Sequence, residues 1–204
     1  MVGCRKRTPS RDIFEAINRK HYLESEVQSM LAANPKLVAE RDSNGDSPLT
    51  AAAVHGLTGL VTTLLKLGSK VDEVGRYGST ALINACHSRH LATVNVLLAH
   101  GADPNIKNDD GEVALHQVIM WCPEEVVLME ALIKAGADVS IRDGKGRTLL
   151  QVCRERRTQY EVPNSSRSPS LTKRILEDYD CAEALLESEL SKRHGTEQGA
   201  PDRR

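Results

Sequence analysis

Histidine and cysteine side chains at close spacing are the first candidates for chemistry in this sequence. His87 and His90 lie three residues apart, directly after Cys86, and would share one face of a helix. Zinc is usually bound by four such ligands, or by three and a water molecule, and no further pair with suitable spacing occurs nearby. The five cysteines form no Cys-x-x-Cys pair, and their odd number suits reduced thiols. The sequence therefore predicts no metal site and no cofactor.

Motifs of nucleotide-binding and hydrolytic enzymes are also missing. The run Gly144-Lys145-Gly146 lacks the spacing of a phosphate-binding loop, and neither Gly-x-Ser-x-Gly nor His-Glu-x-x-His occurs. We therefore predict a protein without enzymatic activity. Ser168 and Thr8 each precede a proline and could accept proline-directed phosphate. Such dipeptides are common, so the alternative is that neither is modified.

The composition narrows the class of protein. The 204 residues carry a formal net charge of -1, and only six of them are aromatic. A core built from Leu, Val, Ile and Ala favours closely spaced helices over a β-sandwich or barrel. No apolar run approaches the roughly 20 residues that span a bilayer, and no apolar stretch follows the basic start. We expect a cytoplasmic protein, with the nucleus as the alternative, that does not insert into membranes and does not bind nucleic acid.

A repeated pattern predicts the elements that position these residues. Segments that begin at Ser47, Thr80, Val113 and Thr148 align with one another at offsets of 33, 33 and 35 residues. A hydroxyl side chain at such a start accepts hydrogen bonds from the free amides of a helix. In the first three units a leucine-rich segment follows and ends in a glycine such as Gly68, which suits the left-handed residue after a helix. One helix pair of this size cannot bury its apolar face alone, so the units must stack.

These segments closely resemble the ankyrin repeat, over about 180 residues. The resemblance implies an all-α solenoid of stacked helix-turn-helix units joined by β-hairpin-like turns. It places about four clear repeats, starting near residues 42, 75, 108 and 143, after a divergent cap at residues 11–41. His116 matches the family's capping histidine, whose ring is expected to bond the backbone of a neighbouring unit. Cys86 and Cys153 occupy a core position of the first helices, which favours buried, inert thiols.

The two ends depart from this pattern. Residues 1–10 are expected to be a flexible basic segment, and residues 193–204 a disordered tail. Residues 158–170 look like an insertion, followed by a helix at residues 171–192. We interpret that helix as a displaced second helix that caps the stack and completes a repeat domain at 11–192; the alternative is an autonomous tail helix. Its apolar side chains at roughly helical spacing are Ile175, Leu176, Cys181, Ala184, Leu185 and Leu190.

Charge is unevenly distributed near this end. Residues 142–174 have a net charge of +6, whereas residues 175–191 have -6. Two interpretations follow. The acidic helix and the basic fourth unit balance each other at modest gain, because exposed ion pairs are weak. Alternatively, the basic unit binds a partner and the acidic helix masks it.

The resemblance also predicts a binding surface, because ankyrin repeat proteins use their concave side. Trp121 is the only tryptophan and lies where the stack does not require a large apolar group, although a local two-residue insertion could turn it inward instead. Asn105 matches the turn asparagine that an iron- and 2-oxoglutarate-dependent oxygenase hydroxylates; its alternative role is to close the turn. The concave positions selected on helices are His55, His87, Ser88, Met120, Trp121 and Arg156, and those at turn tips are Arg76, Tyr77, Asp109, Asp110 and Lys145.

These observations predict a monomeric, non-enzymatic protein that binds another protein as an adaptor or inhibitor. The alternative is a regulated switch, in which the acidic helix at 171–192 covers the basic fourth repeat until a partner or phosphorylation displaces it. The sequence does not identify the partner.

Overall fold

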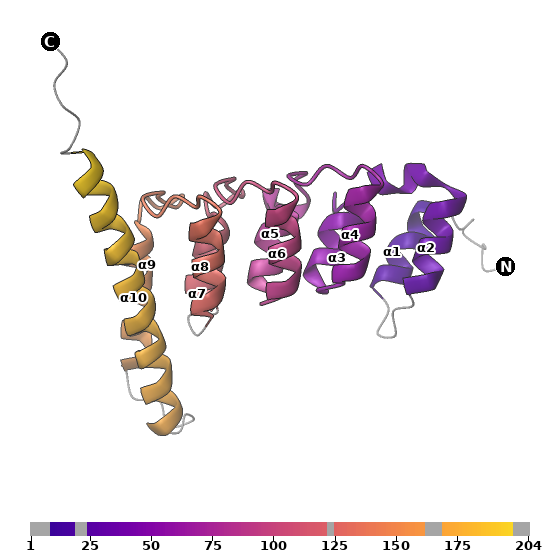
Figure 1. The fold of residues 1–204 in the computed structure, drawn as a ribbon. Helices are drawn as coiled ribbons and strands as arrows, with labels where there is room; N and C mark the ends of the chain where they lie inside the picture. The colour runs from indigo at the N-terminus through magenta and orange to yellow at the C-terminus, as the bar shows by residue number, and fades with distance from the viewer. Residues whose placement is uncertain (1–8, 19–23, 122–124, 162–168, 198–204) are drawn as a thin grey trace, which may run out of the picture.

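The computed structural model describes residues 9–18, 24–121, 125–161 and 169–197, in which paired helices stand side by side in a single row (Figure 1). Within this part of the chain there is no strand, and the turns close with isolated antiparallel bridges, Val74 with Thr80 and Arg142 with Thr148. The all-α prediction is therefore confirmed. The α-helices are α1 (Pro9–Ile17), α2 (Glu24–Ala33), α3 (Pro48–Val54), α4 (Thr58–Lys66), α5 (Ala81–His87), α6 (Leu91–Ala99), α7 (Ala114–Trp121), α8 (Val126–Lys134), α9 (Leu149–Glu161) and α10 (Pro169–Glu197), and the short 3-10 helices are η1 (Pro35–Ala39) and η2 (Arg76–Gly78).

Hydrogen bonds at the first residues explain why each repeat begins a helix where it does. The hydroxyl oxygens of Ser47 and Thr80 each accept a backbone N–H three residues later, at 3.2 Å. At the start of α7 the acceptor is His116 Nδ1, 3.2 Å from the amide nitrogen of Val113. The prediction that His116 bonds a neighbouring unit is wrong, because its ring caps its own helix.

Inner and outer helices form two layers. The inner helices α3, α5, α7 and α9 pack on one another in sequence, and the outer helices α4, α6 and α8 follow the same order. Fully buried small residues such as Ala52 and Ala85 allow the inner helices to approach closely. The core of the described residues is mainly aliphatic, as the composition predicts, and its buried aromatic residues are Phe14 and Tyr179.

A contact between neighbouring repeats depends on a glycine after α3. Gly56 has φ of +65°, and a Cβ at this position would lie 2.5 Å from the ring of His90. That ring bonds the neighbouring unit, because His90 Nε2 lies 3.2 Å from the carbonyl oxygen of Val54. Gly68 also has a positive φ, +93°, but a Cβ at this position would meet open space. A substitution at Gly68 therefore measures the backbone strain without a steric clash.

We expect Gly56→Ala to lower the free energy of unfolding by about 2 kcal/mol, from left-handed strain together with displacement of the His90 ring. Gly68→Ala carries the strain alone and should cost about 1 kcal/mol. Urea denaturation followed by circular dichroism measures both losses. Equal losses would show that the His90 contact contributes nothing.

Both ends differ from the predicted boundaries. Helix α1 begins at Pro9, inside the segment 1–10 that was expected to be flexible. Helix α9 reaches Glu161, so it includes the first residues of the expected insertion. Helix α10 begins at Pro169 and continues to Glu197, into the segment expected to be a disordered tail. It lies along α9 and also contacts α8, so it occupies the place of an outer helix of the fourth repeat (Figure 1).

The buried face of α10 agrees with the predicted apolar residues only in part. Ile175, Leu185 and Leu190 are partly buried against the core. Tyr179, Ala182 and Leu186 are fully buried, whereas Cys181 and Ala184 are exposed. Positions at intervals of three and four residues share one face of a helix, so this face is narrower than the apolar residues alone suggested. The Tyr179 ring lies 5.7 Å from that of Tyr160 on α9.

Charged side chains also join α9 to α10. Arg154 Nε lies 2.6 Å from Glu183 Oε1, and Arg154 Nη2 lies 2.8 Å from Glu187 Oε1. Arg157 Nε lies 2.6 Å from Asp180 Oδ1. The acidic helix and the basic fourth unit therefore contact each other, as both interpretations of their charge require.

Candidate partner-binding surface

The inner helices and the turn tips enclose a solvent-open space of about 440 Å³, called the concave hollow below. Its two large aromatic residues are Tyr77, at a turn tip, and Trp121, at the end of α7. The lining residues are Tyr77, Ser79, Ile83, Asn84, His87, Asn108, Asp110, Glu112, Gln117, Met120 and Trp121.

Trp121 stays at the surface. The residue is 49% exposed, so its side chain does not turn inward to fill a gap in the core. The His87 ring meets the indole edge-on, with centroids 5.6 Å apart, and the Arg156 guanidinium lies 5.2 Å from the indole centroid. Arg89 donates a 2.9 Å hydrogen bond to the carbonyl oxygen of Trp121. Groups from the repeats on either side therefore contact Trp121.

Tyr77 is more exposed, at 61%, and has φ of 58°. The Arg76 guanidinium stacks 4.4 Å from the centre of its ring, and Arg76 N donates to Asp46 Oδ1 over 2.9 Å. The Tyr77 carbonyl accepts a 3.0 Å hydrogen bond from Asp109 N, which belongs to the next turn. This bond between successive turns fixes the tyrosine relative to the acidic turn beside it.

A chain of polar side chains crosses the base of the concave hollow. His87 Nδ1 lies 3.1 Å from Gln117 Oε1, and Gln117 Nε2 donates to Glu112 Oε2 over 2.7 Å. Burial raises the pKa of Glu112; the hydrogen bond from Gln117 opposes this, and the nearby Asp110 and Asp143 carboxylates add to it. The base of the hollow is thus a site of closely spaced negative charge.

Some predicted residues lie around the concave hollow and others do not. Tyr77, His87, Asp110, Met120 and Trp121 line it, and Arg156 contacts the indole and donates a 2.7 Å hydrogen bond to the Met120 carbonyl. Asp109, Asp110 and Lys145 line an adjoining hollow of about 380 Å³ together with Glu112, Asp143 and Gly144.

Two further predicted residues lie elsewhere, and two are outside the described part of the chain. The His55 ring bonds the Asn18 side chain at 2.9 Å, near the N-terminal end of the row. Ser88 is the C-cap of α5. Ser168 and Thr8 lie outside the described residues.

Sequence reasoning missed Asn84 and Gln117. They occupy equivalent positions in two consecutive repeats, where the other units have Ala51 and Val152. Polar residues at a position that is otherwise apolar were the available signal. That signal would have pointed to the two middle repeats.

The Asn105 side chain bridges two repeats. Its Oδ1 accepts the amide of Asp138 over 2.7 Å, and its Nδ2 donates to the Gly136 carbonyl over 3.1 Å. Asp72 makes a similar bond one repeat earlier, where its Oδ1 accepts the amide of Asp103 over 3.0 Å. These bonds explain an amide at this position; its hydroxylation stays a prediction.

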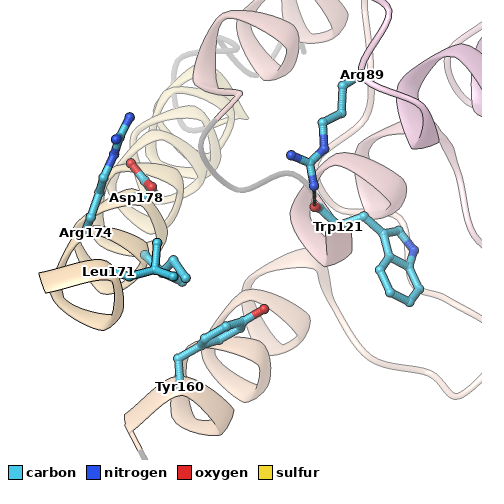
Figure 2. A pocket seen from close by; sticks show the side chains of 7 residues that line it. Arg89, Trp121, Tyr160, Leu171, Arg174 and Asp178 are labelled. Carbon is cyan, nitrogen blue, oxygen red and sulfur yellow. Dashed lines mark hydrogen bonds between the residues drawn. The ribbon is translucent and has the colours of Figure 1, made fainter. Parts of the chain in front are cut away.

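A further hollow, of about 310 Å³, separates the ends of α7 and α9 from the first turns of α10. Figure 2 shows the Tyr160 ring below it, with Leu171, Arg174 and Asp178 of α10 on the opposite side from Arg89. The Trp121 backbone approaches this space, while its indole points away (Figure 2). Both sides of α7 are thus accessible near its last residue.

Two searches of the described ranges had negative results. They hold no group of three or more side chains placed to bind a metal ion. None of their helices combines the length and the apolar character that a membrane-spanning segment needs.

The repeats match proteins of known family. Residues 13–108 match the family model for ankyrin repeats in three copies. An ankyrin repeat protein of fowlpox virus is 34% identical over 100 residues, which are 48% of this chain and 29% of the relative. Mouse Rabankyrin-5 is 31% identical over 128 residues (58% and 11%), and human ankyrin repeat and SOCS box protein 16 is 31% identical over 118 residues (57% and 25%). The chain spans less than a third of the length of each of these relatives, and its residues 13–108 are ankyrin repeats.

Proposed function

We propose that this chain is a non-enzymatic adaptor or inhibitor that binds one partner protein on its concave face. Ankyrin repeats are protein–protein interaction modules. One observation carries the proposal: the two aromatic residues of the regular repeats, Tyr77 and Trp121, are both exposed and both line the concave hollow. Tryptophan, tyrosine and arginine supply much of the binding energy at protein interfaces.

The reactive side chains support a non-enzymatic role. Burial, with a smaller effect from Glu183, raises the pKa of the Cys153 thiol to about 12, so this thiol is protonated and inert at neutral pH. His116 is fully buried and caps α7. Both side chains have structural roles that account for them.

The regulated switch is a second candidate, favoured by the ion pairs between Arg154, Arg157 and the acidic face of α10. In this function the helix covers basic side chains until a partner displaces it. The burial of Tyr179 and Leu186 opposes it, because an easily displaced helix would bury little apolar surface.

The double variant Tyr77→Ala, Trp121→Ala tests the concave face. We expect it to capture at least tenfold less partner protein from cell lysate, because anchor residues each contribute about 2 kcal/mol or more. Its melting temperature should fall by less than about 3 °C, because both residues are exposed. Quantitative mass spectrometry of the captured proteins, with thermal unfolding of the purified variant, measures the two effects.

A matched control removes apolar side chains from elsewhere on the surface. Leu67 and Val127 are 44% and 58% exposed and lie outside the concave hollow. The variant Leu67→Ala, Val127→Ala should capture the same proteins as the unmodified chain. Equal capture by both double variants would contradict the proposal.

A further inference from the structure

We infer that the concave hollow receives an arginine side chain of the partner protein, which deepens the proposed function and rests on it. The inference begins with charge. Asp110 and Glu112 line the hollow, and among the described lining residues there is no lysine or arginine. Asp109 and Asp143 line the adjoining hollow on the same side. A cationic side chain would complement this charge.

Arg147, the basic residue that acts on Glu112, is already paired with other carboxylates. Arg147 lowers the pKa of Glu112 only slightly, as the weakest of the influences on it. Its guanidinium is held by Asp143, at 2.7 Å, and by Glu155, at 2.6 Å. The Lys145 amide bonds Asp143 Oδ1 at 2.9 Å, and its side chain lines the adjoining hollow. The charge at Glu112 therefore remains available to a ligand.

The aromatic walls favour a guanidinium over an ammonium group. Tyr77 and Trp121 stand at the rim, and each already has an intramolecular guanidinium near its ring, from Arg76 and Arg156. A planar guanidinium combines stacking on such rings with paired hydrogen bonds to a carboxylate. Asn84 lines the same space, and its side-chain amide carries a further hydrogen-bond acceptor. Carboxylates and exposed aromatic rings that line the same hollow thus match an arginine better than a lysine.

Peptide arrays test this inference on the full chain. The probes are synthetic 12-residue peptides of random uncharged sequence with one central Arg, Lys, Glu or Ala. We expect the Arg set to be the most strongly retained, followed by Lys. Peptides from the Arg set are then measured in solution by isothermal titration calorimetry. Replacement of their arginine by alanine should weaken binding at least tenfold.

Two variants connect the effect to the carboxylates. Glu112→Gln keeps the acceptor for Gln117 but removes the charge, and together with Asp110→Asn it should weaken binding of the Arg peptides about tenfold. Glu130→Gln makes the same chemical change on α8, outside the concave hollow, and should leave the affinity unchanged. The affinity of the unmodified chain should also fall as salt is raised.

The possible failures are distinguishable. If the Arg set is not enriched over the Ala and Glu sets, or if Glu112→Gln with Asp110→Asn binds Arg peptides normally, the arginine inference is wrong. The concave-face proposal survives in that case, provided that the retained peptides still require Tyr77 and Trp121. If Arg peptides bind the Tyr77→Ala, Trp121→Ala variant with full affinity, both the inference and the proposed function fail.

Discussion

Deletion of residues 169–204, which removes α10, will lower the free energy of unfolding by about 5 kcal/mol. The deletion removes the buried side chains of Tyr179 and Leu186 and uncovers the face of α9 that carries Cys153, whose Sγ lies 3.7 Å from the Tyr179 carbonyl oxygen. Each large apolar side chain contributes about 1.5–3 kcal/mol when it is buried, and the uncovered face of α9 adds to the loss. A domain of ordinary stability has only about 5–15 kcal/mol in total. Urea denaturation of the truncated and complete chains measures the difference.

The regulated switch predicts the opposite result. If α10 is a displaceable mask, the truncated array stays folded with nearly unchanged stability and binds its partner more tightly. Single substitutions within α10 make the same distinction without truncation. Leu186→Ala should cost at least about 2 kcal/mol, as buried leucines do, whereas Leu171→Ala, at a residue that is 50% exposed in the same helix, should cost less than about 0.5 kcal/mol.

Charge and apolar burial can be separated on the same helix. Arg154 and Arg157 lie at the surface, and exposed ion pairs contribute about 1 kcal/mol or less each. The variant Arg154→Gln, Arg157→Gln should therefore destabilise the chain far less than the removal of α10. A loss of similar size would show that charge, and not apolar burial, holds α10 on α9.

The repeats could be predicted from sequence because each of their signals is local. The Ser47 and Thr80 hydroxyls cap helices within three residues, and the periodic glycines end the second helices within one turn. The buried face of α10 could not be predicted in the same way. Its apolar residues cover more than one face, and the choice of Tyr179, Ala182 and Leu186 depends on the position of α9, which is distant in sequence.

In the candidate site, too, local features could be predicted from the sequence and contacts between repeats could not. Position within a repeat placed Tyr77 and Trp121 on the concave side, with an inward-turned Trp121 as the alternative, and the structure leaves both exposed. The contacts around them depend on stacking: His87 and Arg156 reach the indole from the repeats on either side. A single sequence gives repeat positions but not which side chains meet between repeats, so the contact between His87 and Gln117 was not foreseen.

His116 will make stability depend on pH below neutrality. The residue is fully buried, and burial, which outweighs the opposing attraction of Asp143, lowers the pKa of its imidazole from 6.5 to about 4. The positive charges of Arg147 and Lys107 act in the same direction as burial. Its Nδ1 accepts the amide of Val113 and must be unprotonated to do so. Protonation would therefore both charge a buried ring and break the cap of α7.

The sign follows from the two pKa values. Between pH 6.5 and pH 4 the unfolded chain binds a proton at this histidine and the folded chain does not, so the stability contribution is complete above pH 6.5 and is lost as the pH falls toward 4. The whole loss is about 3 kcal/mol, of which about 2 kcal/mol should be seen between pH 7.5 and pH 5. Urea denaturation at a series of pH values measures it.

His116→Gln is the matched control, because the fourth repeat already has a glutamine as the capping residue at the equivalent position. Gln151 occupies the equivalent position, and its Oε1 accepts the amide of Thr148 over 2.8 Å. The variant keeps an acceptor for the cap but cannot titrate, so its stability should fall by about 2 kcal/mol less than that of the unmodified chain between pH 7.5 and pH 5. The carboxylates and the other histidines are present in both proteins, and their effects cancel in this comparison. Parallel pH profiles would show that the buried ring has an ordinary pKa, and would assign the acid sensitivity to other groups.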